Sequence, residues 1–241
     1  MILDKWGNHP AVFAIEPVNE PWFHSDFKTL RDFYRTVRTN MKAKAPHLTF
    51  VFHDSFKFSG LVWNRLFDDD DMDNVVMDTH LYMFFWPKLL TIGEYAEAYN
   101  LILSQASRIK YPVWMGEWSM ATDPCAMWLN GFNDSANQVK HHDCEWVECP
   151  RSYLADEFAV DFDRTAETLG PFGTGTESMP KNGTCPRDSA KWSSDKHMTK
   201  LGKDYIDMFD KHLHGQFFWN FRNELEPRWN YITAYDNGWL N

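Results

Sequence analysis

Two glutamates that each follow a short apolar segment could act together in acid–base chemistry. Glu20 lies in Val18-Asn-Glu-Pro21, and Glu117 lies in Met115-Gly-Glu-Trp-Ser119. Hydrolysis of a glycosidic bond needs two carboxyl groups flanking the bond, and in retaining enzymes they are about 5–5.5 Å apart. One is the nucleophile, and the other is protonated to assist the leaving group. A single glutamate at a strand end would more simply be an ion-paired or surface residue, so the hypothesis depends on the pair.

Polar residues near the two glutamates fit the same chemistry. Asn19 directly precedes Glu20 and could bind the sugar hydroxyl beside the reacting carbon. His80 and Tyr82 lie between the two glutamates in the sequence. A tyrosine hydroxyl near the nucleophile could donate a hydrogen bond that keeps the nucleophile ionised. The Asn-Glu-Pro tripeptide alone is moderately specific, but its combination with His-x-Tyr and Gly-Glu-Trp is a strong signal.

Short apolar segments alternate with amphipathic segments and would position these residues. The apolar segments predict five buried strands, at 11–15, 48–52, 74–78, 112–115 and 216–219. The amphipathic segments predict helices at 25–45, 93–109 and 194–214. Ser25 or Asp26 would cap the first helix, and Pro46 would end it. Strands with two apolar faces that are separated by helices indicate a parallel α/β sheet.

Candidate site residues follow every predicted strand. In chain order they are Asn19 with Glu20, His53 with Asp54, His80 with Tyr82, Glu117, and Asn220. A (β/α)8 barrel gathers its active site at the carboxyl ends of all its strands, whereas an open sheet binds its ligand at one switch point. The predicted fold class is therefore α/β, a (β/α)8 TIM barrel.

Composition excludes several classes of partner. The formal net charge is −10, which disfavours nucleic acid and anionic membranes. No apolar run is long enough to span a bilayer, and the first residues do not resemble a signal peptide. Aromatic residues make up 17% of the chain, which suits sugar stacking or a large core equally. We expect no metal, because the acidic run 68–71 lacks the pattern of a calcium loop and 141–143 lacks zinc-site spacing.

Residues 119–193 have a different character and predict a long loop insertion after the Glu117 strand. This stretch contains all four cysteines, Cys125, Cys144, Cys149 and Cys185, and the sequons at Asn133 and Asn182. Two disulfides and an extracytoplasmic location would account for both features. Four free thiols and two chance sequons are the alternative.

These residues resemble glycoside hydrolase family 5, within the clan of barrels whose catalytic glutamates lie on strands 4 and 7. The resemblance spans roughly residues 8–239. It implies that Glu20 is the acid/base, Glu117 the nucleophile, and Asn19 a contact to the sugar at the cleavage site. His80 and Tyr82 match the motif on strand 6, and Trp219 matches the tryptophan that lies under the same sugar.

Further segments are similar to the fungal-type exo-β-1,3-glucanases of this family. They are 53–56 with Trp63, 117–131, and 218–224 with Trp229. The resemblance implies that Asn130 binds substrate and that Phe85 belongs to an aromatic clamp at the entrance. It also implies a Cys125–Cys185 disulfide, and Cys144 could pair with Cys149.

The implied activity is hydrolysis of β-1,3-glucan from the chain end, without a metal or organic cofactor. Asp134 replaces a family arginine and Leu81 replaces a frequent second histidine, so the linkage stays open. An endo-acting family 5 glycanase on cellulose or mannan is one alternative. An inactive glucan-binding fragment or pseudoenzyme is the other. The resemblance also implies a monomer that acts outside the cell or in the cell wall.

The position of Glu20 predicts an N-terminally truncated barrel. A complete barrel has about 250 residues, or roughly 30 per βα unit, so the fourth strand should begin near residue 90 or later. Here it begins at residue 11. We therefore expect residues 1–241 to form a partial catalytic domain with strands 4 to 8, and Ile2–Trp6 to end the preceding helix. Its signal peptide would lie in the missing part. Such a sheet would expose its edges and half its core, and the chain alone would be poorly soluble or inactive.

Overall fold

The computed structural model describes residues 2–68, 71–83, 92–122, 194–222 and 227–240. The chain forms two compact units. The first comprises Met1–Leu81, Ala98–Trp118 and Asp207–Phe217, and the second comprises Tyr82–Glu97, Ser119–Ile206 and Phe218–Asn241.

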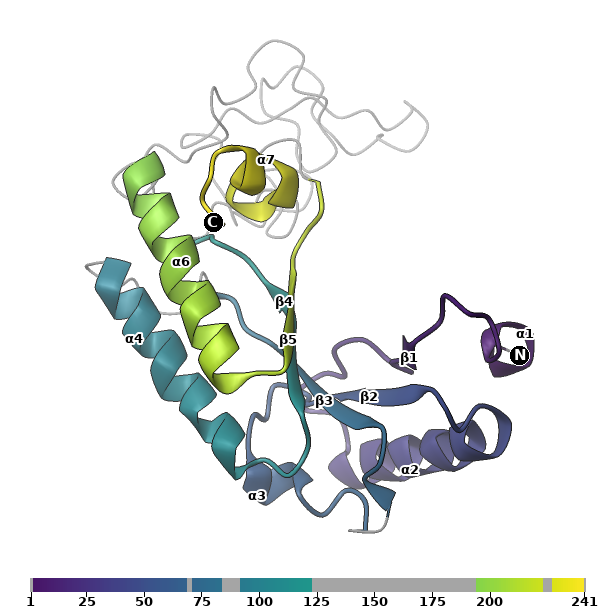
Figure 1. Cartoon of the computed structure of the whole chain (residues 1–241). Helices are drawn as coiled ribbons and strands as arrows, with labels where there is room; N and C mark the ends of the chain where they lie inside the picture. Colours follow the sequence, from purple (N-terminus) through teal and green to yellow (C-terminus); the bar gives the residue numbers. More distant parts are fainter. Residues whose placement is uncertain (1, 69–70, 84–91, 123–193, 223–226, 241) are drawn as a thin grey trace, which may run out of the picture. The chain divides into compact units, whose positions relative to one another are not determined.

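One five-stranded sheet dominates the first unit (Figure 1). Its strands are β1 (Ala14–Ile15), β2 (Thr49–His53), β3 (Val75–His80), β4 (Val113–Trp118) and β5 (Gly215–Phe218). The spatial order of the strands equals their order in the sequence, and β1 to β4 pair in parallel. A doubly wound sheet reverses its strand order at a switch point, so the uninterrupted order favours part of a barrel.

Helices connect the strands. They are α1 (Ile2–Trp6), α2 (Phe27–Lys44), α3 (Gly60–Trp63), α4 (Ile92–Leu103), η3 (Ser104–Arg108), α6 (Asp195–His212), η7 (Pro227–Trp229) and α7 (Tyr231–Asp236). None of the helices among the described residues is both long and apolar enough to cross a membrane. The α2 helix begins after Asp26, whose side chain accepts a hydrogen bond from the Thr29 backbone N–H at 2.8 Å. This bond satisfies one of the donors that every helix start leaves unpaired.

The core of the first unit lies between α2 and the sheet (Figure 1). Tyr34 of α2 is fully buried against Phe50 and Phe52 of β2, with ring centroids 6.2 and 5.7 Å away. Trp63 of α3 packs on the same rings and donates its indole N–H to the Asp54 carbonyl at 3.1 Å. Fully buried aromatic rings make β2 a rigid base for the residues that follow it.

The helices α4 and α6 lie side by side where both belong to the first unit. Tyr99 and Phe209 meet with their rings 5.4 Å apart, and His212 contacts the Asn100 side chain at 2.9 Å. Tyr99 also donates its hydroxyl to the Leu81 carbonyl at 2.6 Å, just after β3. These contacts hold the end of β3 close to α4.

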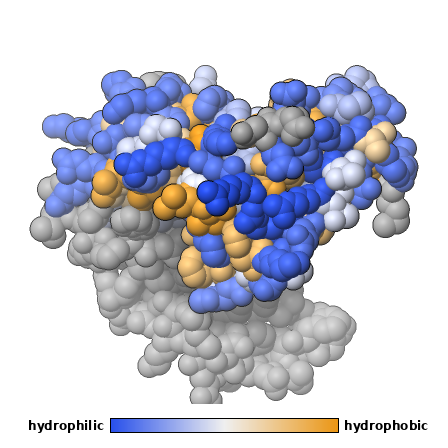
Figure 2. Space-filling view, turned by 90° about the horizontal axis from the view of Figure 1, so that it is seen from below, coloured by the Kyte–Doolittle hydropathy of each residue, from blue (hydrophilic) through white to orange (hydrophobic). Residues whose placement is uncertain are grey.

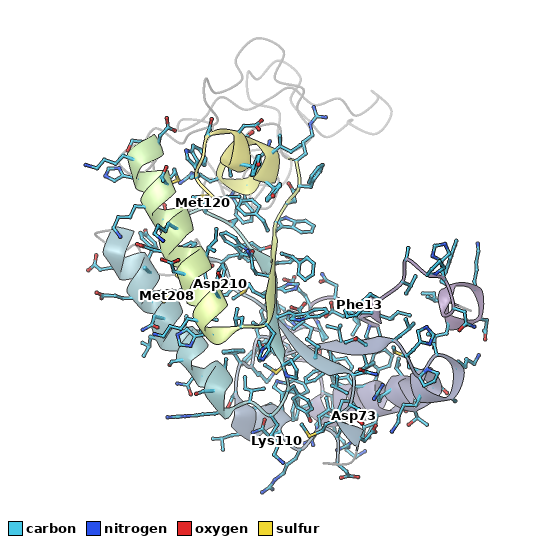
Figure 3. The ribbon with its side chains drawn as sticks, viewed as in Figure 1. Phe13, Asp73, Lys110, Met120, Met208 and Asp210 are labelled. Carbon is cyan, nitrogen blue, oxygen red and sulfur yellow. The ribbon has the colours of Figure 1, made fainter. Side chains whose placement is uncertain are left out.

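Part of the apolar surface of the sheet is exposed. Phe13 lies directly before β1 and is labelled in Figure 3. It stacks on Trp114 of β4 with ring centroids 6.4 Å apart. Trp114 in turn contacts Phe217 of β5 at 5.9 Å. Phe13 is 68% exposed and Phe217 55% exposed. On the face in Figure 2, hydrophobic residues likewise appear between hydrophilic ones.

The predicted elements are present, with corrected ends. Each of the five predicted strand segments contains a strand, but β1 has only two residues, because its pairing with β2 begins at Ala14. The predicted helix 93–109 is two elements, because a 3-10 turn replaces the α-helix after Leu103. The expected helix at Ile2–Trp6 is α1, and Asp26 rather than Ser25 is the cap of α2. The short helices α3 and α7 were not predicted.

Candidate active site

Three strands bring the central residues of the site together. Glu20 lies in the segment after β1, His80 ends β3, and Glu117 is the fifth residue of β4. His80 is paired with Glu117 across the β3–β4 ladder, where an irregularity between Thr79 and His80 shifts the register. Irregularities of this kind re-aim side chains at the ends of strands. The parallel sheet therefore places all three residues at the carboxyl-terminal ends of its strands.

His80 contacts three carboxylates. Its Nδ1 lies 2.7 Å from Glu20 Oε1 and 3.5 Å from Glu117 Oε2, and its Nε2 lies 3.0 Å from Asp78 Oδ2. Glu20 Oε1 and Glu117 Oε2 can therefore be no farther apart than the sum of their two distances to His80 Nδ1. That upper limit is below the about 6.5–9.5 Å that separates the carboxyl groups of inverting glycosidases.

The surrounding carboxylates control the charge of His80. Its side chain is 2% exposed, and burial alone would lower the pKa of the imidazole. Hydrogen bonds to Asp78 and Glu20, with the charges of Asp78 and Glu117, outweigh burial and raise the pKa of His80 to about 10. The His80 ring is therefore charged at neutral pH.

Glu20 has an unusual backbone for a glutamate. Its φ is 45°, in the left-handed region that non-glycine residues rarely adopt. It also precedes Pro21, which restricts its backbone further. Strain of this type costs about 1–3 kcal/mol and is concentrated at functional sites. The Glu20 side chain is 35% exposed, so a ligand can reach it.

Asp78 lies beneath His80 and packs against the backbone of β4. A Cβ atom built on Gly116 would overlap both oxygens of the Asp78 carboxylate. Glu16, the residue directly after β1, also approaches Asp78. Burial, followed by the charge and the hydrogen bond of Asp78, raises the pKa of Glu16 to about 8. Two neighbouring carboxyl groups cannot both ionise at low cost, so this pair keeps one proton at neutral pH.

A second buried histidine borders the site. The His53 ring lies edge-on to the His80 ring, with centroids 4.4 Å apart. Burial and then the positive charge of His80 lower the pKa of His53 to about 3, so the ring is neutral. Its Nδ1 accepts a hydrogen bond from the Ser55 N–H at 2.9 Å, which assigns its proton to Nε2. Burial raises the pKa of the adjacent Asp54 to about 7, and Thr79 Oγ1 donates to Asp54 at 2.9 Å.

The histidines do not form a good metal site. Glu20, His53 and His80 each offer a ligand atom, and these atoms lie within 4.8 Å of one another. Both nitrogens of His80, however, face carboxylate oxygens. Binding a metal through this ring would break one of these contacts. We interpret the cluster as a proton-sharing network.

The other predicted site residues have different positions. Asn19 is exposed beside Glu20. Tyr82 belongs to the second unit, where it is buried against Trp229 with ring centroids 5.1 Å apart. Trp219, also in the second unit, follows β5, is 46% exposed and precedes a cis peptide bond to Asn220. The predicted residues that lie outside the described part of the chain are Phe85, Asn130, Asp134, Asn133, Asn182 and the four cysteines.

Sequence reasoning missed two members of the network. Glu16 received no role, and Asp78 was only the last residue of the predicted strand 74–78. A signal was present for both residues. Glu16 directly follows an apolar segment, and Asp78 is a charged residue inside one. A charged residue in a buried strand needs a partner, and that requirement could have marked both positions.

Comparison of the sequence with known proteins found relatives named as glucan 1,3-beta-glucosidases. No protein-family model matches the chain. The chain is 24% identical over 231 residues to a glucan 1,3-beta-glucosidase of Blumeria graminis, covering 92% of the chain and 46% of the relative. It is 26% identical to a probable glucan 1,3-beta-glucosidase A of Aspergillus terreus, covering 95% and 48%. A Neosartorya fischeri protein of the same name is 31% identical, over 65% of the chain and 40% of the relative. The chain spans about half the length of these relatives.

Solved structures share the fold at low sequence identity. The crystal structure of a rutinosidase from Aspergillus niger matches 95% of the chain and 51% of its own, with a TM-score of 0.56 and 14% identity. The structure of AoRut matches 94% and 50%, with a TM-score of 0.54 and 16% identity. The five parallel strands in sequential order, together with these neighbours, fit part of a (β/α)8 barrel.

Proposed function

We propose that this chain carries the catalytic residues of a retaining β-glycoside hydrolase of the family 5 type that acts on β-1,3-glucan. One observation carries the proposal: Glu20 and Glu117, from two separate segments, both reach Nδ1 of His80. This arrangement keeps the two carboxyl groups close enough for the retaining mechanism. The names of the relatives, glucan 1,3-beta-glucosidase, support the substrate class.

In the proposed mechanism the two carboxyl groups have separate tasks. Glu117 attacks the anomeric carbon and forms a glycosyl-enzyme. Glu20 gives a proton to the departing glycosidic oxygen, and then removes one from the water that hydrolyses the intermediate. The 2.7 Å contact to His80 Nδ1 would orient the Glu20 carboxyl group for this role. In a complete barrel, the strand before Glu20 would be strand 4, and the strand that contains Glu117 would be strand 7.

The remaining predicted residues would bind the sugar. Asn19 would contact the hydroxyl beside the reacting carbon, and we assign Tyr82 to substrate binding. Trp219 would stack under the sugar ring, and an exposed tryptophan face suits that task. Phe85 and Asn130 would act farther along the glucan. We propose exo action, a location outside the cell or in the cell wall, and a monomer.

Substitution of each glutamate tests the assignment. Glu117→Gln should abolish hydrolysis of laminari-oligosaccharides while circular dichroism stays unchanged. Glu20→Ala should lower kcat by about 10²–10⁴-fold, the usual contribution of an acid–base group. Azide should restore turnover to Glu20→Ala, because it can attack the glycosyl-enzyme without a base, and it should not restore Glu117→Gln. Glu97→Gln, on the exposed surface of α4, is the matched control and should keep full activity.

The products of hydrolysis distinguish the alternative activities. Release of glucose from laminarin, with no shortening of carboxymethylcellulose, supports exo action on β-1,3-glucan. Internal cleavage of carboxymethylcellulose would instead favour an endo-acting glycanase. Binding of laminarin without hydrolysis, both by the 241-residue chain and by any longer product of its gene, would favour a non-catalytic glucan-binding protein. Unchanged turnover in Glu117→Gln or Glu20→Ala would refute the assignment of the two roles.

A further inference from the structure

The contact between Glu16 and Asp78 joins two buried carboxyl groups. Glu16 follows β1 and Asp78 lies in β3, so β2 separates them in the sheet. In barrels, side chains from alternate strands share one interior layer, which explains how these two residues meet. Among the described residues, no hydrogen-bond donor reaches Glu16 Oε1 or Asp78 Oδ1, although both oxygens are buried.

A single proton on one of the two carboxyl groups would give both unpaired oxygens a hydrogen-bond partner. Two ionised carboxylates are acceptors only, so neither could satisfy the other. If one carboxyl carries a proton, it donates to its neighbour and both oxygens gain a partner. Burial and the charge of Asp78 raise the pKa of Glu16 to about 8, so Glu16 is the donor at neutral pH. Asp78 meanwhile accepts from His80 Nε2 through its other oxygen, Oδ2, at 3.0 Å.

We propose that Glu16 is a positioning residue, which donates a shared proton to Asp78 and thereby fixes Asp78 on His80. Asp78 then has one oxygen for each neighbour, Oδ1 for Glu16 and Oδ2 for His80. Gly116 lets the carboxylate lie directly against β4, where it has little room to turn. With Asp78 fixed, the His80 ring keeps its Nδ1 directed at Glu20. The catalytic consequence of this proposal rests on the proposed function.

Ionisation of Glu16 would therefore act as a switch. Above its pKa, a second negative charge would face Asp78 and the donated hydrogen bond would disappear. Other ionisable groups also face this pair. They are His80 on β3, Glu117 on β4, Asp54 after β2 and Tyr34 on α2. The pKa of His80 is raised to about 10 and that of Asp54 to about 7, and burial raises the pKa of Tyr34 above its usual range. Substitution of Glu16 and of Asp54, one at a time, distinguishes a transition of Glu16 from one of Asp54.

Glu16→Gln tests the switch, because the glutamine amide is a permanent donor with the shape of protonated glutamate. In the wild type, the ¹⁵N signals of the His80 ring should shift with a midpoint near pH 8. In Glu16→Gln this step should vanish. Asp54→Asn is the matched control and should keep the step, since it removes a different buried acid. His80→Gln identifies the His80 signals among the ten histidines.

Activity gives a second readout. Wild-type kcat should fall above about pH 8, whereas Glu16→Gln should retain its kcat to higher pH, with KM unchanged. Glu16→Ala should lower kcat by about 10-fold to 100-fold, the loss expected for one hydrogen bond to a charged group. A His80 titration that is identical in the wild type and Glu16→Gln would overturn the proposal. If neither the chain nor any longer product of its gene hydrolyses a glycoside, the proposed function fails, but the His80 titration still decides the role of Glu16.

Discussion

Gly116→Ala should damage the site through a single methyl group. The new Cβ would occupy the space of the Asp78 carboxylate, which lies against the β4 backbone at this residue. Asp78 is buried in β3 and cannot retreat into solvent, since its side chain is only 5% exposed. The carboxylate must therefore turn away, and its 3.0 Å contact to His80 Nε2 should break.

Two costs set the size of the effect. Overpacking a well-packed interior costs about 1–3 kcal/mol, and a lost hydrogen bond to a charged group costs about 1.5–3 kcal/mol. These terms overlap, so we expect Gly116→Ala to lower the free energy of unfolding by about 2–5 kcal/mol. If the proposed function is correct, kcat should fall as well, because His80 loses its fixed orientation.

Urea unfolding and kcat on an aryl β-glucoside measure the two effects. Gly215→Ala on the neighbouring strand β5 is the matched control. Its Cβ would contact only the edge of the Trp114 ring, at 3.3 Å, and the side chain can yield by that small amount. Both substitutions restrict the unfolded chain equally, so their difference isolates the overlap with Asp78. Equal stability and activity of the two variants would refute the reasoning.

Two further predictions concern stability. The raised pKa of His80, about 10 against an unfolded value near 6.5, stabilises the folded state below pH 6.5, and this contribution is lost as the pH rises through 10. The difference in the free energy of unfolding between wild type and His80→Gln, measured by urea titration, should thus shrink by up to a few kcal/mol from pH 6 to pH 10. A difference that stays constant with pH would contradict the raised pKa of His80. Phe52→Ala should cost about 3–5 kcal/mol because its ring is fully buried, whereas Leu61→Ala, at a residue 98% exposed, should stay within about 0.5 kcal/mol. Similar calorimetric melting temperatures for these two variants would place Phe52 outside the core.

The sheet was predictable because its strands carry their own signal. Each strand is a short apolar run between turn or helix residues, and a strand buried on both faces has this pattern regardless of its partners. The ends were harder to predict. Phe13 belongs to the first apolar run but is exposed before β1. The helices α3 and α7 have four and six residues, which is too short for a helical period to appear.

The candidate site was predictable in part. Glu20, His80 and Glu117 follow or end apolar runs, and parallel strands bring such positions to one edge. Their roles remain proposals, as do those of Asn19 and Trp219. The contact between His80 and both glutamates was not predictable, because it depends on the register irregularity after Thr79. Local sequence does not specify such an irregularity.

By itself, the sequence determined the types and order of the strands and the positions of the two glutamates. These depend on local hydrophobic patterns, which each segment contains in full. Only the tertiary structure decided that Glu16 approaches Asp78 and that Asp78 contacts His80. A pKa depends on burial and on charges from other segments, and here those segments are three different strands and the turns after them. The buried His80 beside Glu20 and Glu117 is charged at neutral pH, and the residues next to either glutamate in the sequence do not reveal this.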